Sequence, residues 1–184
     1  VAVFEGNIYA GTIEGIYRTS INNSNADDFS TWDFLGVDAG FPDDYSTNAL
    51  AVYQDQLYIG INEDIYRLEG GVPVLFSDQD EAYGLRYFSA EGEYLLAGYR
   101  CDLGGCGNGQ VLYFSPDGSG DALASGCIGR TNFAIEDQQG RFWFGDEWMG
   151  FRWLDNTDDE VCNTFEINSP YSQRVWNMEV YNDT

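Results

Sequence analysis

The sequence predicts an all-β fold built from repeated four-stranded units, and three observations support this. Aromatic residues make up 16% of the 184 residues, and the 22 glycines stand in short clusters with Asp and Asn, a composition typical of short strands joined by tight turns. Apolar and polar residues alternate with period two in the strand-like segments, which excludes a helical solenoid. One pattern of segments recurs four times along the chain.

Each repeat contains an alternating strand, a polar turn, a second strand that closes on Gly, and a third strand rich in Tyr, Trp and Arg. The closing glycines are 49, 38 and 47 residues apart, close to the roughly 40 to 50 residues of a propeller blade: Gly11, Gly60, Gly98 and Gly145. Blades are therefore expected to start near residues 1, 50, 88 and 133. Three fourth strands are expected between the repeats: VPVLFS from Val72, DALASGCI from Asp121 and VCNTFEIN from Val161.

A fifth repeat begins near the end of the sequence. RVWNMEVYNDT from Arg174 matches the start of the other repeats and stops before a partner strand. Since most propellers have more than four blades, we expect residues 1–184 to form about four blades of a larger ring of about six to eight. A closed four-bladed ring and an association of two such halves are the alternatives.

Two segments resemble a known repeat: GFPDDYSTNALAVYQDQLYIGINEDIYRL from Gly40 and GRTNFAIEDQQGRFWFGDEWMGFRWLD from Gly129. They are similar to the two-component-regulator type of propeller repeat, with its Asn, its Asp and Gly turn residues and its Trp-x-Gly. Such repeats form periplasmic sensing parts of some hybrid histidine kinases and occur in bacterial surface proteins, including components associated with type IX secretion. The resemblance implies a recognition scaffold that is extracellular, on the cell surface or in the periplasm, without a cofactor.

The charge and the kinds of basic residue exclude several classes of binding partner and of catalytic site. The chain has 31 acidic residues, eight basic residues and no His, for a net charge of −23, and every basic residue is Arg. Nucleic acid and anionic membranes are therefore poor partners, and no segment approaches the roughly 18 apolar residues of a membrane-spanning helix. Without His or Lys, the chain cannot form a Ser-His-Asp triad, a His-ligated metal site, a Schiff base or a P-loop.

Four cysteines predict two disulfides formed in an oxidising compartment: Cys101, Cys106, Cys127 and Cys162. Their sequence positions leave three connectivities open. A tetrathiolate zinc site is the competing interpretation, but structural zinc usually needs two tight Cys pairs, and only the first two cysteines are close in sequence.

A ligand-binding face is expected where the loops after the second strands meet the junctions between repeats. These junctions carry Asn48, Asn132 and Asn177, together with Arg86, Arg130 and Arg174, while Arg100 ends a second strand. Arginines gathered there can hold a carboxylate or an anionic sugar. The structural alternative is that Asn caps turns and Arg neutralises neighbouring Asp.

The loop Asp146, Glu147, Trp148 places two carboxylates beside an aromatic ring on that face. It predicts a sugar subsite, or the acid and base of a glycosidase; an exposed acidic turn is the structural alternative. On the opposite face, Asp155, Asp158 and Glu160 are candidate calcium ligands, although their spacing lacks the Gly and distal Glu of an EF-hand.

These observations favour a non-catalytic recognition module that binds a protein or glycan. Its other expected partners are the rest of the propeller or a second surface subunit. The alternatives are a carbohydrate-active hydrolase or lyase that uses Asp146 and Glu147, and a structural module of a surface assembly.

Overall fold

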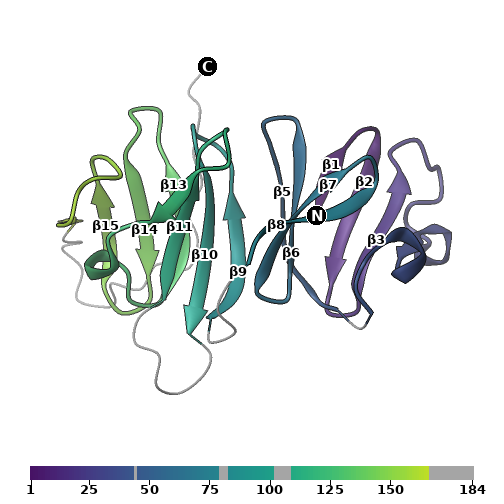
Figure 1. Ribbon diagram of the computed structural model, residues 1–184, viewed down its shortest axis with the longest axis horizontal. Helices are drawn as coiled ribbons and strands as arrows, with labels where there is room; N and C mark the ends of the chain where they lie inside the picture. The colour runs from purple at the N-terminus through teal and green to yellow at the C-terminus, as the bar shows by residue number, and fades with distance from the viewer. Residues whose placement is uncertain (44, 79–82, 102–108, 166–184) are drawn as a thin grey trace. The chain divides into compact units, whose positions relative to one another are not determined.

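The computed structural model describes residues 1–43, 45–78, 83–101 and 109–165 (Figure 1). In this part of the chain, sixteen strands form four separate four-stranded antiparallel sheets, and three short 3-10 helices lie in the connections. In every sheet the strands pair in sequence order. The prediction of repeated four-stranded units is therefore confirmed, with one sheet for each repeat. The chain divides into two compact units, residues 1–80 and 81–184.

The first unit contains two sheets. The first sheet has the order β1 (Ala2–Phe4), β2 (Asn7–Thr12), β3 (Gly15–Ser20) and β4 (Asp33–Leu35), with η1 (Phe29–Thr31) before β4 and η2 (Val37–Ala39) after it. The second sheet has the order β5 (Thr47–Tyr53), β6 (Gln56–Ile61), β7 (Asp64–Glu69) and β8 (Val72–Ser77). Strand β8 coincides with the expected fourth strand VPVLFS.

The second unit repeats this arrangement. One sheet has the order β9 (Tyr83–Ser89), β10 (Leu95–Cys101), β11 (Gln110–Phe114) and β12 (Gly120–Ala122), and η3 (Ser125–Cys127) follows it. The other sheet has the order β13 (Thr131–Glu136), β14 (Phe142–Asp146), β15 (Gly150–Leu154) and β16 (Asn163–Phe165). The expected strand from Asp121 is only partly a strand, because the chain turns into η3 after Ala122.

The first strands of three sheets begin earlier than the sequence pattern indicates. They start at residues 47, 83 and 131 instead of 50, 88 and 133. The reason is a β-bulge in each strand, which adds one residue and shifts the register of pairing. A bulge interrupts the period-two alternation, so the regular pattern is visible only beyond it.

In each unit the two sheets pack against each other through buried aliphatic and aromatic side chains, and burial of these side chains stabilises the pair. Fully buried members include Ile16, Leu57 and Ile59 in the first unit, and Leu96, Phe142 and Phe144 in the second. Gly98 shows how closely the second unit is packed, because a Cβ at this position would overlap with the ring of Tyr87. The repeat glycine of β10 is thus required by close packing.

The fifth repeat from Arg174, with Asn177, lies outside the described residues. Among the residues that the structure describes, no helix has the length and apolar character needed to cross a bilayer.

Candidate functional site

The three bulges lie at equivalent positions, and their extra residues are three of the predicted face residues. Asn48, Arg86 and Asn132 each stand opposite the junction between the repeat glycine and the residue after it. Bulges re-aim side chains and are common beside binding sites. The Asn48 side chain uses this placement to donate from Nδ2 to the carbonyl oxygen of Asn62, at 2.7 Å.

Asp146 is the structural centre of the loop between β14 and β15. Its side chain is 0% exposed and accepts four hydrogen bonds. Oδ1 accepts from the backbone N–H groups of Trp148 and Met149, both at 2.8 Å, and Oδ2 accepts from Gly129 N at 2.8 Å and Thr131 Oγ1 at 3.1 Å. This carboxylate therefore fixes the loop and the start of β13 to each other.

The length of the loop explains why this sheet needs an acid at position 146. The equivalent positions, one residue after the repeat glycine, are Thr12, Ile61 and Tyr99 in the other sheets. In the first sheet a two-residue loop follows, and the Thr12 hydroxyl accepts from Glu14 N at 3.1 Å. Three residues separate Asp146 from its partner Gly150, so two backbone N–H groups need an acceptor, which the carboxylate supplies.

Glu147 lies between Arg100 of β10 and Arg130, which directly precedes β13. Its Oε2 is 3.5 Å from Arg100 Nη2 and 3.6 Å from Arg130 Nη1. The guanidinium of Arg130 also lies 5.5 Å from the centre of the Trp148 ring, and that side chain is 59% exposed. We call Arg100, Arg130, Glu147 and Trp148 the arginine cluster. It combines two cations, one carboxylate and an accessible aromatic surface at one end of the second unit.

The structure thus brings together five of the predicted face residues, since Asp146 holds the loop of the arginine cluster. Arg86 and Asn132 occupy the bulges of β9 and β13 at the same end of their strands. Arg174 lies outside the described residues.

A buried hydroxyl without a hydrogen-bond partner lies near this loop. Tyr87 Oη is buried and has no hydrogen-bond partner among the residues that the structure describes. Burial raises the pKa of the Tyr87 phenol well above its usual range, and the negative charge of Asp146 raises it further. The phenol therefore stays protonated and acts as a packing group, with its ring centre 5.0 Å from that of Phe133.

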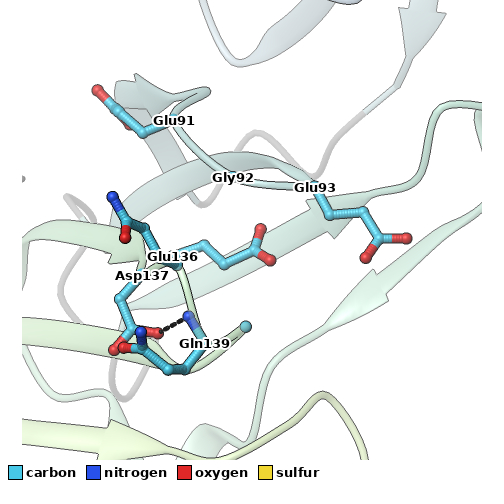
Figure 2. Close-up of a pocket in the computed structure, with 8 residues that line it drawn as sticks. Glu91, Gly92, Glu93, Glu136, Asp137 and Gln139 are labelled. Carbon is cyan, nitrogen blue, oxygen red and sulfur yellow. Dashed lines mark hydrogen bonds between the residues drawn. The ribbon is translucent and has the colours of Figure 1, made fainter. Parts of the chain in front are cut away.

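A second feature, which the sequence did not predict, is an acidic pocket of about 740 Å³ at the other end of these sheets (Figure 2). Its walls are the turns that follow β9 and β13: Glu91, Gly92, Glu93, Glu136, Asp137 and Gln139. Glu136 is 5% exposed, and its Oε2 accepts from Tyr94 N at 2.9 Å. Burial raises the pKa of the Glu136 carboxyl, although hydrogen bonds from the backbone oppose the change. The acidic residues of the two turns are visible in the sequence. That they line one pocket follows only from the packing of the two sheets.

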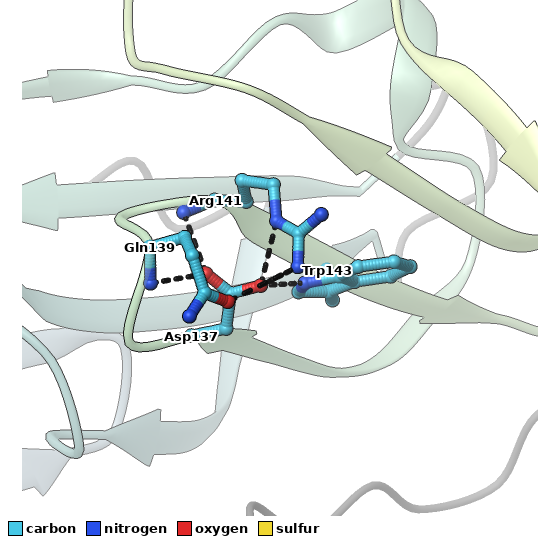
Figure 3. A network of polar contacts seen from close by, with 4 residues as sticks. All are labelled: Asp137, Gln139, Arg141 and Trp143. Carbon is cyan, nitrogen blue, oxygen red and sulfur yellow. Dashed lines mark hydrogen bonds and ion pairs between the residues drawn. The ribbon is translucent and has the colours of Figure 1, made fainter.

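Asp137 belongs to the same turn but is fully engaged within the chain (Figure 3). Its carboxylate accepts from the backbone of Gln139 and Arg141, from Arg141 Nε at 2.8 Å and from Trp143 Nε1 at 2.7 Å. Burial alone would raise the pKa of Asp137, but the hydrogen bonds from Trp143 and Arg141 outweigh it and lower the pKa. This network closes the turn between β13 and β14.

The candidate calcium ligands do not converge. Among residues 1–43, 45–78, 83–101 and 109–165, no three acidic or cysteine side chains are placed to hold a metal ion. Asp155, Asp158 and Glu160 are exposed, and Asp155 Oδ2 accepts from Asn163 Nδ2 at 3.2 Å. Asp159 Oδ2 accepts from Asp155 N at 2.9 Å, and Asn156 Oδ1 accepts from Asp158 N at 2.9 Å. The geometry of this turn therefore gives calcium no support.

Cys127 and Cys162 are free thiols in the structure, so the predicted disulfides are not seen there. They are nevertheless neighbours, since Cys162 packs against the core that contains Cys127. Burial, followed by the hydrogen bond with Cys162, raises the pKa of the Cys127 thiol to about 12. Arg152 Nη1 contacts Cys162 Sγ at 3.7 Å and donates to the Gly126 carbonyl at 3.2 Å. Cys106 and the side chain of Cys101 lie outside the described residues.

Searches against known protein families and against curated proteins find no match to this chain. The similarity of its segments to the two-component-regulator repeat therefore stays a prediction from the sequence.

Proposed function

We propose that this chain is a non-catalytic recognition module whose four sheets are blades of a larger β-propeller. In this proposal it acts outside the cytoplasm, on the cell surface or in the periplasm, and binds a protein or glycan. The four antiparallel sheets of consecutive strands support the propeller, since a blade is such a sheet. The resemblance of two repeats to a sensing propeller supports the location and the class of function.

The observation that carries the proposal is the arginine cluster. Arg100 is the second-last residue of β10, and Arg130 precedes β13, so the cluster joins two blades at the end where bulges re-aim side chains. Its loop is held by the four hydrogen bonds of Asp146, which leaves Trp148 in a fixed and accessible position. A preformed site of this kind spends little conformational entropy when a ligand binds.

The runner-up is a glycan hydrolase or lyase that uses Asp146 and Glu147. Its acid and base would have to reach a bound substrate. Asp146 is 0% exposed and its carboxylate is occupied by four donors, so it is poorly placed for proton transfer. This geometry favours recognition over catalysis.

The test is binding of the full chain to an array of glycans and peptides. We expect at least one ligand class to bind the wild type, to bind Arg130→Gln much more weakly, and to bind Arg67→Gln unchanged. Arg67 is a matched control because it also pairs with a glutamate, Glu69, but lies on a different sheet from the arginine cluster. No binding to any array member, or equal loss with both variants, would contradict the proposal. If the wild type converts a bound saccharide to product and Glu147→Gln abolishes this conversion, the enzyme alternative is favoured.

A further inference from the structure

Two thiols that lie 35 positions apart in the sequence meet in the core of the second unit. Cys127 ends η3, the connection between two sheets, and Cys162 directly precedes β16, the last strand of its sheet. Cys127 is 0% exposed, and Cys162 is partly buried against the same core. The thiol and the backbone N–H of Cys162 both lie within hydrogen-bond reach of Cys127 Sγ. The sequence left three connectivities open, and the packing favours this pair.

The side chain of Arg152 connects these thiols to the loop of the arginine cluster. Its Nη1 lies 3.7 Å from Cys162 Sγ and donates to the carbonyl oxygen of Gly126 at 3.2 Å. The same nitrogen lies 3.3 Å from Met149 Sδ. Gly126 belongs to η3, and Met149 belongs to the loop between β14 and β15. A change at the two sulfur atoms can therefore reach the loop through one guanidinium group.

We propose that Cys127 and Cys162 form a reversible disulfide, and that this bond, through Arg152, tightens the loop of the arginine cluster. A disulfide holds its sulfur atoms about 2.05 Å apart and restricts the dihedral angle between them, so it removes freedom from both attached segments. One of these segments leads from η3 to Arg130, and the other begins β16. The bond thus fixes part of the arginine cluster to the outermost strand of the same unit.

The bond forms by thiol–disulfide exchange with a small disulfide such as oxidised glutathione. Cys162 is the more accessible thiol, so its thiolate attacks one sulfur of the small disulfide, and one small thiolate leaves. The Cys127 thiolate then attacks Cys162 Sγ and expels the second small thiolate. The two cysteines lose two electrons, which the small disulfide gains, and their two protons pass to the small thiols. Excess small thiol reverses both steps.

The surroundings of Cys127 make it the second thiol to react. Burial raises the pKa of this thiol to about 12, so its thiolate, the reactive form, is rare near neutral pH. Once Cys162 carries the mixed disulfide, the second step is intramolecular, and the contact between the two residues favours it over attack by a distant thiol.

The experiment compares the full chain in reduced and in oxidised glutathione buffers by peptide mapping, thermal unfolding and hydrogen exchange. We expect oxidation to link Cys127 to Cys162 and to raise the midpoint of thermal unfolding by about 5–15 °C. Exchange in peptides that cover residues 146–150 should become about threefold slower or more. None of these measurements needs a ligand, so their outcome is independent of the proposed function.

Variants separate the bond from its effect on the loop. Cys162→Ser should abolish both changes, and Cys127→Ala serves if that variant folds poorly by circular dichroism. The double variant Cys101→Ser, Cys106→Ser is the matched control and should keep both changes. Arg152→Gln should keep the cross-link and the higher unfolding midpoint but lose the slower exchange in the loop.

Three results would overturn the inference. If mapping pairs Cys127 or Cys162 with another cysteine, the connectivity is wrong. If both thiols stay free in oxidised glutathione, or if Cys162→Ser gains the same stability as the wild type, the cross-link does not form. If oxidation leaves exchange in the loop unchanged, or if Arg152→Gln keeps the slower exchange, the bond does not act on the loop through Arg152.

Discussion

Replacement of Asp146 tests the structural basis of the arginine cluster. Asp146→Ala leaves the backbone N–H groups of Gly129, Trp148 and Met149 without their acceptor. Each unsatisfied buried donor costs about 1–3 kcal/mol. Water that enters beside the exposed Trp148 can accept from some of these N–H groups and so lowers the total cost. We expect the free energy of unfolding to fall by about 3–5 kcal/mol.

Asp146→Asn separates the number of acceptors from the charge. Its single amide oxygen can serve only one side of the loop. If this oxygen continues to accept from Trp148 N and Met149 N, the side-chain NH₂ group takes the place of Oδ2. The Thr131 hydroxyl can rotate to accept from the NH₂ group, but Gly129 N then faces a second donor and has no acceptor. This variant should lose about 1–3 kcal/mol, between the wild type and Asp146→Ala.

The assay for both variants is urea unfolding, followed by circular dichroism, with the free energy extrapolated to water. Asp33→Ala is the control, because its side chain is 75% exposed and pairs with Arg18 at 3.6 Å, so it should cost less than about 1 kcal/mol. A loss below about 1 kcal/mol for Asp146→Ala, or equal losses for Ala and Asn, would mean that the Asp146 carboxylate does not hold the loop.

Three further predictions concern other buried groups. Tyr87→Phe removes a buried hydroxyl that finds no partner in the described part of the chain, so urea unfolding should show no loss of stability, or a gain of up to about 1 kcal/mol; a clear loss would mean that the hydroxyl is bonded. Burial raises the pKa of Glu136, so the folded wild type binds a proton more tightly than the unfolded chain, and stability should fall as pH rises from about 4.3 through the raised pKa. Thermal scans of Glu136→Gln between about pH 4 and 7 should lack this fall, and superimposable profiles would argue against it. With a thiol pKa of about 12, Cys127 should resist alkylation in the reduced, folded chain at about pH 8. Incubation with oxidised glutathione should link it to Cys162, as non-reducing chymotryptic mapping would show; pairing of either thiol with another cysteine would contradict the contact between them.

The sheets were predictable from the sequence because one pattern of strands, glycine and turn residues recurs four times along the chain. The fourth strand at Val72 was predicted residue by residue, since it is long and apolar. The start of the first strands was not, because Asn48, Arg86 and Asn132 sit in bulges that break the alternation.

Most residues of the site were predicted from the sequence, but the role of each residue was not. Sequence reasoning grouped Asp146 and Glu147 as a pair of turn acids. In the structure one carboxylate is buried and accepts four hydrogen bonds, while its neighbour contacts Arg100 and Arg130. These partners come from elsewhere in the sequence, so only packing of the two sheets reveals them. The acidic pocket around Glu136 could not be predicted for the same reason.

The most direct test of the recognition proposal is hydrogen exchange of the full chain with and without a ligand from the array, because it shows which end of the second unit binds. We expect new protection in peptides that cover residues 128–131 and 146–150, which contain Arg130, Glu147 and Trp148 of the arginine cluster. Protection confined to residues 91–94 and 136–140, around the acidic pocket, would contradict it.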